Sequence, residues 1–352
     1  MKLFKQLTLL VISSIVSMGL TAQSYYSPAF GLNGSALKTS LHNIIKNHSS
    51  QGWPLWSYFP STDTKSTNIV YDIYSDVPSG IPPYTLAYGV NQCGTYSQEG
   101  DCFNHEHTWP STFFNDAYPM RTDLHHVLPT DGFVNNKRSN LPYGETTTSS
   151  WISQNNSKIG FSNTYAGYTD KVFEPIDSFK GDLARIYFYM TTRYESEDGG
   201  WSNWTMANGA QLTPDAITLL MAWHHADPVS QKEINRNNAI YLIQNNRNPF
   251  IDYPVFADCI WGAVDCAGVG ISNPEWAQQI QVYPIPTHDI LHLNYPSSIK
   301  IHEYQVYDIL GRTIITSTLE HKTISISSIP NGNYTIVLNT NQGVIRKLFS
   351  KE

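Results

Sequence analysis

The chain has 352 residues, of which 41% are hydrophobic and 14% are charged, with 29 acidic against 22 basic residues and a net charge of −7. After residue 22 no stretch reaches the roughly 18 apolar residues needed to cross a bilayer. A chain without residues 1–22 is therefore not expected to be an integral membrane protein. The acidic balance is poor evidence for nucleic-acid binding, so such a function requires a local basic groove and a bound cation to compensate.

The N-terminus has the pattern of a secretory signal. Lys2 and Lys5 precede a mostly apolar run over residues 7–20, and small residues lead to a cleavage point after Ala22. We therefore expect residues 1–22 to be removed and the mature chain to be a soluble, exported monomer.

Four cysteines lie at two short spacings, which suits an oxidising compartment. We expect the local disulfides Cys93–Cys102 and Cys259–Cys266. A thiolate metal site is the weaker alternative, because these spacings fit no zinc-ligand pattern.

The sequence pattern changes near residue 272, where short β-rich runs replace helical spacing. This change predicts a mixed α and β domain over 23–272 and a small all-β sandwich over 273–352. In the first, apolar residues at helical spacing predict a helix over 179–194. Thr213 and Asp227, each followed by proline, predict the starts of two more helices. Together they indicate a helical subdomain behind the site. In the second, short β-rich runs recur between turns such as 310–312.

Glu106 stands beside His107. A carboxylate is a hard oxygen ligand for Mg²⁺, and an imidazole is a proton acceptor that titrates near neutrality. Neighbours on a strand point to opposite faces, so both can serve one site only at a strand end or bend, and Pro110 fits such an ending. Alternation sends His105 to the side of His107, which favours a supporting role over that of a third ligand.

Residues 123–140 predict a short strand, a turn and a helix that Thr130 or Asp131 caps. Asn135 falls one turn inside this helix, where its amide oxygen is a candidate second metal ligand, with Asn140 as a rival. Lys137 and Arg138 add positive charge suited to phosphate.

These motifs resemble the bacterial endonuclease I family. The matching segments, in family order between about residues 35 and 265, are 106–110, 123–132, 134–135, 138–140, 173–175, 180–185, 189–190 and 246–252. The resemblance implies an α+β fold with a ββα-metal (His-Me finger) nuclease core, which cuts DNA, often RNA too, through one ion. We expect Mg²⁺, with Mn²⁺ or Ca²⁺ as alternatives.

Carried over residue by residue, the resemblance makes His107 the general base, Glu106 a metal ligand and Asn135 the second ligand. Arg185 is the first candidate for a catalytic cation at the phosphate, balanced against a buried ion pair with Asp182. Some members carry an insertion before residue 123 that this chain lacks, and Arg121 is a candidate for the basic residue that the insertion supplies.

The C-terminal region resembles the sorting domain of the type IX secretion system. The matching segments are 282–287, 306–312, 324–326, 331–334 and 347–349, with isoleucine at 285 where the family usually has asparagine. The resemblance implies a partner in the type IX machinery and a secreted or cell-surface location. An ordinary adhesive β-domain is the alternative.

Two other functions compete with a secreted endonuclease. The first is a catalytically inactive nucleic-acid-binding or adhesive surface protein, which has no need of Glu106, His107 and Asn135 together. The second is a zinc hydrolase that uses His105, His107 and either His125 or His126.

Overall fold

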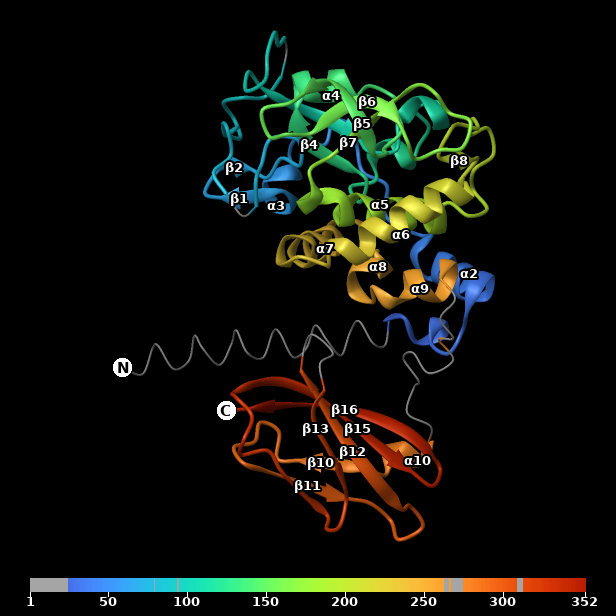
Figure 1. The fold of residues 1–352 in the computed structure, drawn as a ribbon, viewed down its shortest axis with the longest axis vertical. Coiled ribbons are helices and arrows are strands. Elements are labelled where there is room, and N and C mark those ends of the chain that lie inside the picture. Colours follow the sequence, from blue (N-terminus) through green and yellow to red (C-terminus); the bar gives the residue numbers. More distant parts are fainter. Residues whose placement is uncertain (1–24, 79, 94, 263–265, 267–274, 309–312) are drawn as a thin grey trace. The chain divides into compact units, whose positions relative to one another are not determined.

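The computed structural model describes residues 25–352 apart from 79, 94, 263–265, 267–274 and 309–312. The chain divides into two compact units, residues 1–270 and 271–352 (Figure 1). The secretory signal, the turn over 310–312 and the domain boundary at 272 lie outside the described residues. No helix in the described part of the chain is both long and apolar enough to span a bilayer.

The first unit combines helices with small antiparallel sheets, which confirms the α+β class. Its longer helices are α2 (Gly34–Ile45), α5 (Lys180–Arg193), α6 (Pro214–Ala226) and α7 (Gln231–Gln244), and its shorter ones are α3 (Phe59–Thr62), α4 (Gly132–Arg138), α8 (Pro249–Asp252) and α9 (Val255–Trp261). Its sheets are β1 (Thr64–Ser66) with β2 (Ile69–Val70), β3 (Phe103–His107) with β4 (Val127–Asp131), β5 (Thr146–Ile152) with β6 (Lys158–Ser162) and β7 (Lys171–Glu174), and β8 (Ala207–Asn208) with β9 (Gln211–Leu212).

Helix α5 forms the centre of the helical layer, since every one of its residues is buried and it packs against α2, α6 and α8 (Figure 1). The expected start of α6 is confirmed, because the Thr213 hydroxyl accepts a hydrogen bond from the Ala216 amide. The expected start of α7 at Asp227 is wrong. Ser230 and Glu233 form a capping box there instead, while the Asp227 carboxylate accepts from the Gly181 amide.

The second unit contains two antiparallel sheets around one apolar core, as the β-rich runs predicted. One has the order β10 (Gln281–Tyr283), β11 (Ile290–Asn294), β14 (Thr323–Ser325), and the other β13 (Thr313–Thr318), β12 (Ile301–Asp308), β15 (Gly332–Thr340), β16 (Gly343–Lys351). A short helix, α10 (Glu275–Gln278), precedes them. Leu291, Val306 and Ile336 belong to the shared core.

The pair β3–β4 followed at once by α4 is the part of the fold that carries the predicted motifs. Glu106 pairs with Leu128 across the two strands, and the Asp131 carboxylate caps α4 by accepting from the Val134 amide. Both expected disulfides are confirmed, and Cys93–Cys102 lies against the start of α4. A side chain at Gly132 would place its Cβ 2.7 Å from the Cys93 sulfur, so only glycine allows this packing.

Candidate active site

Strand β3, helix α4 and the residues that follow each of them line an open cleft that contains the predicted residues Glu106, His107 and Asn135. Glu106 and His107 are neighbours on β3, yet both reach the cleft, because His107 is the last residue of that strand. The expectation of a strand end at this position is confirmed. The other side chains of the cleft are Tyr96, Asn104, His105, Pro110, Ser111, Asn136, Arg138, Ser139 and Asn140.

The imidazole of His107 is held with one nitrogen available for proton transfer. Its Nε2 lies 3.0 Å from the backbone carbonyl oxygen of Arg121. Because a carbonyl oxygen only accepts hydrogen bonds, Nε2 carries the proton and Nδ1 keeps its lone pair. Burial lowers the pKa of His107 to about 3, with the neighbouring His126 acting in the same direction. The ring is therefore a neutral proton acceptor at neutral pH.

Trp53 and Arg121 form a wall beside this imidazole. The Trp53 ring is 37% exposed and stacks on His107 with 5.8 Å between ring centroids. The guanidinium carbon of Arg121 lies 4.9 Å from the centroid of Trp53. Within the described residues no carboxylate pairs with Arg121, and its buried Nε has no hydrogen-bond partner. A guanidinium that pairs with no carboxylate of the described residues therefore lies near His107.

Glu106 offers one oxygen to the cleft. Its Oε1 accepts hydrogen bonds from the Tyr74 hydroxyl at 2.7 Å and from Nη1 of Arg138 at 3.0 Å. Oε2 is the oxygen left for a cation. Burial raises the pKa of Glu106 to about 7, although Arg138 and Tyr74 act in the opposite direction. A cation in the cleft would favour the ionised carboxylate.

Asn135 is fixed against β3 by both hydrogens of its amide nitrogen. Nδ2 donates to Oδ1 of Asn104 at 2.7 Å and to the His105 carbonyl at 3.1 Å. The amide oxygen is then the atom left to face a cation. Asn140 also borders the cleft. The bonds that tie Asn135 to the strand of Glu106 favour Asn135 as the ligand.

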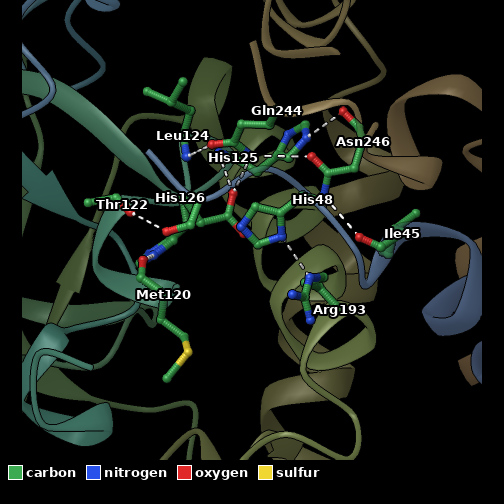
Figure 2. Close-up of polar contacts among 12 residues, drawn as sticks. Ile45, His48, Met120, Thr122, Leu124, His125, His126, Arg193, Gln244 and Asn246 are labelled. Carbon is green, nitrogen blue, oxygen red and sulfur yellow. Dashed lines mark hydrogen bonds and ion pairs between the residues drawn. The ribbon is translucent and has the colours of Figure 1, made fainter. Parts of the chain in front are cut away.

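His105, His125 and His126 make hydrogen bonds to the backbone of the protein, which argues against a zinc hydrolase that uses them as ligands together with His107. Nε2 of His105 accepts from the Leu55 amide at 3.1 Å, so that ring supports the site from behind. His125 and His126 are both fully buried. Their Nε2 atoms lie against the carbonyls of Asn246 and Met120 (Figure 2). In the described part of the chain no group of three or more His, Cys, Asp or Glu side chains could hold a metal.

Asp123 anchors this turn from within the core. Its carboxylate accepts from the hydroxyls of Tyr189 and Tyr194, at 2.8 and 2.9 Å, and from the amide of Gln244 at 3.0 Å. Gln244 also accepts from the Leu124 amide (Figure 2). The segment 123–126 that the sequence singled out is therefore anchored in the core and contributes no side chain to the lining of the cleft.

Arg185 is not brought to the cleft. It is 0% exposed on α5, where Nε lies 2.5 Å from Oε1 of Glu233 and Nη2 lies 2.9 Å from Oε2 of the same residue. Asp182, the partner expected from helical spacing, is 3.7 Å away. The geometry supports the ion-pair interpretation, with Glu233 as the main partner, because α7 packs a carboxylate onto the guanidinium. Arg138 is likewise buried and bound to Glu106, so it is not free for phosphate.

Four residues at the site were missed at the level of sequence: Trp53, Tyr74, Tyr96 and Tyr143. Tyr96 lies inside the Cys93–Cys102 loop, so the short cysteine spacing beside β3 was a usable signal for it. The others come from distant segments, and no local pattern marks them.

The model of the Endonuclease I family matches residues 33–255, and that of the secretion system C-terminal sorting domain matches residues 281–351. An extracellular ribonuclease of Bacillus amyloliquefaciens is 32% identical over 71% of this chain and 82% of its own length. An Endonuclease-1 of Buchnera aphidicola is 32% identical over 38% of this chain and 46% of its own length. An extracellular deoxyribonuclease of Aeromonas hydrophila is 28% identical over 38% of this chain and 50% of its own length.

The fold, the cleft and these relatives define a secreted nuclease that carries a C-terminal sorting domain. The chain belongs to the endonuclease I family and is an endonuclease. The sorting domain implies a partner in the secretion machinery.

Proposed function

We propose that this endonuclease hydrolyses the phosphodiester bonds of DNA, and of RNA as well, with one divalent metal ion. Mg²⁺ is the proposed ion, with Mn²⁺ or Ca²⁺ as alternatives, and the products carry 5′-phosphate and 3′-hydroxyl ends. The observation that carries the proposal is the meeting of Glu106, His107 and Asn135 in one cleft. Relatives named as a ribonuclease and as a deoxyribonuclease support both substrates.

The donor set fits a hard divalent ion. The Glu106 Oε2 and Asn135 Oδ1 atoms are both oxygens, the ligand type that Mg²⁺ prefers, and two protein ligands leave room for water and phosphate. The succession β3, β4, α4 supports a ββα-metal core, in which the first strand supplies Glu106 and the helix supplies Asn135. When bound, such an ion supplies positive charge beside the phosphate and the departing 3′-oxygen.

His107 is the proposed general base. Its Nδ1 takes a proton from the attacking water, and the Arg121 carbonyl on Nε2 keeps the ring oriented as charge develops on it. Because burial lowers the pKa of His107, its ring stays unprotonated before substrate binds. Binding through backbone phosphates implies little preference among bases.

Cleavage of circular plasmid tests the proposed metal requirement. We expect nicking and degradation with Mg²⁺ or Mn²⁺ and none after EDTA treatment, because the phosphate charge is then not neutralised. Glu106→Gln is expected to show the same loss with metal present, whereas Glu99→Gln, outside the cleft lining, serves as the matched control. Undiminished cleavage in EDTA would contradict the proposal, and labelling of the product ends identifies the phosphate position.

Arg121 is the proposed phosphate-binding cation, in place of Arg185. For a single-stranded oligonucleotide in EDTA, Arg121→Gln is expected to reduce the slope of log affinity against log salt by about 0.7, as for one lost phosphate contact. Lys46→Gln removes the same charge at the end of α2 and is the control. Fluorescence anisotropy measures both slopes. Equal slopes for Arg121→Gln and the unmodified protein would remove Arg121 from this role.

A further inference from the structure

The carboxylate of Glu106 is held by donors from two separate parts of the chain. Tyr74 lies in the segment after β2, and Arg138 is the last residue of α4. Both donate to the same oxygen, Oε1. Tyr74 is 0% exposed and Arg138 is 1% exposed, so neither donor is in contact with solvent.

These two donors are themselves held in place. The hydroxyls of Tyr74 and Tyr143 lie 2.7 Å apart, and the Tyr143 ring lies 4.6 Å from the guanidinium carbon of Arg138. Arg138 also donates to the backbone carbonyls of His107 at 3.0 Å and Thr108 at 2.6 Å. One guanidinium therefore ties together the side chain of Glu106 and the backbone at the end of β3.

Rotation of the Glu106 carboxylate away from this arrangement is unfavourable. It would break two hydrogen bonds between the carboxylate and buried donors, and hydrogen bonds to a charged group are among the stronger ones in a protein interior. Oε1 therefore stays within the protein, and Oε2 alone remains for a ligand in the cleft. The side chain presents a single oxygen in one direction before any ion arrives.

We propose that Tyr74 and Arg138 are positioning residues that make Glu106 a preorganised one-oxygen ligand for the divalent ion. The inference rests on the proposed function, since it assigns a purpose to the environment of the proposed metal ligand. Hydrogen bonds to a ligating carboxylate orient it, and their loss typically lowers metal affinity about 10- to 100-fold. One-oxygen ligation also suits Mg²⁺ and Mn²⁺, which need near-octahedral geometry with several waters retained.

Mn²⁺ binding to the full-length, EDTA-stripped protein tests this inference, with free Mn²⁺ measured by electron paramagnetic resonance. The key variant is Tyr74→Phe, and Tyr194→Phe is a closely matched control. Both phenols are fully buried and donate to a buried carboxylate, at 2.7 Å to Glu106 and at 2.9 Å to Asp123. We expect similar falls in melting temperature for the two variants, but about 10- to 100-fold weaker Mn²⁺ binding only for Tyr74→Phe.

Equal Mn²⁺ affinity in Tyr74→Phe and Tyr194→Phe would overturn the positioning role while leaving the proposed function intact. An unmodified protein that binds no Mn²⁺ and cleaves in EDTA would instead overturn the proposed function, and the inference with it. Should Tyr74→Phe not fold, Tyr143→Phe removes only the hydroxyl that fixes Tyr74 and is expected to weaken Mn²⁺ binding to a smaller extent. Unchanged affinity in that variant also counts against the proposal.

Discussion

Replacing His107 with alanine is expected to lower the rate of nucleic-acid cleavage by about 10²- to 10⁴-fold, the usual contribution of a general base. The physical reason is that His107 borders the cleft with a neutral ring. Its Nε2 donates to the Arg121 carbonyl, which leaves Nδ1 to accept a proton. Without it, water must attack the phosphodiester without losing its proton to the protein. Initial rates on a labelled oligonucleotide at saturating Mg²⁺ measure the effect.

The control for this substitution is His225→Ala. His225 is exposed and bonded to Asp258 on the helical side of the unit, so its loss is expected to leave the rate unchanged. Mn²⁺ binding in His107→Ala is expected to persist, because Glu106 and Asn135 remain. Cleavage by His107→Ala within a few-fold of the unmodified rate would show that another group activates the water.

Arg185→Ala is expected to destabilise the fold by about 3–5 kcal/mol, because it leaves the buried Glu233 carboxylate without its partner. Rate per folded molecule is expected to be unchanged at low temperature, since Arg185 lies away from the cleft lining. Urea denaturation gives the free energy of unfolding, and a cleavage assay corrected for the folded fraction gives the rate. These two readouts separate a structural arginine from a catalytic one.

The double variant Arg185→Met with Glu233→Leu sharpens this test. Replacing both members of a buried ion pair by apolar residues of similar size is often close to neutral, so we expect much of the lost stability to return. A folded Arg185→Ala protein with a large loss of cleavage rate would restore the catalytic role that the sequence suggested. Stability close to that of the unmodified chain would contradict the ion-pair interpretation.

The acidic net charge, which counted against nucleic-acid binding, does not describe the charge at the site. Of the side chains that border the cleft, Glu106 is the single carboxylate, and Arg138 already donates to it. Arg121 stands beside His107 without an anionic partner in the described residues. The distribution of charge over a few ångströms therefore matters more for phosphate binding than the sum of −7 over the chain.

The sequence by itself determined the elements whose signals are local. The cap of α4, which the sequence narrowed to Thr130 or Asp131, the Thr213 cap of α6 and both disulfides depend on residues within about ten positions of one another. The adjacency of Glu106 and His107 at a strand end was also readable, because Pro110 marks where β3 must stop. Caps and turns depend on hydrogen bonds between residues a few positions apart, so the residue types that form them can be recognised in the sequence.

Only the tertiary structure decided which charged residues reach the cleft. Arg185 was the first candidate for the phosphate, balanced against a buried ion pair with Asp182, but α7 brings Glu233 to it across 48 positions and buries the pair. Arg138 was expected to face phosphate, and instead packs under Glu106 with Tyr74, a residue 64 positions earlier. A buried charge must find a partner, and that partner is chosen by how helices and strands pack, so a linear pattern identifies the charge without revealing what it binds.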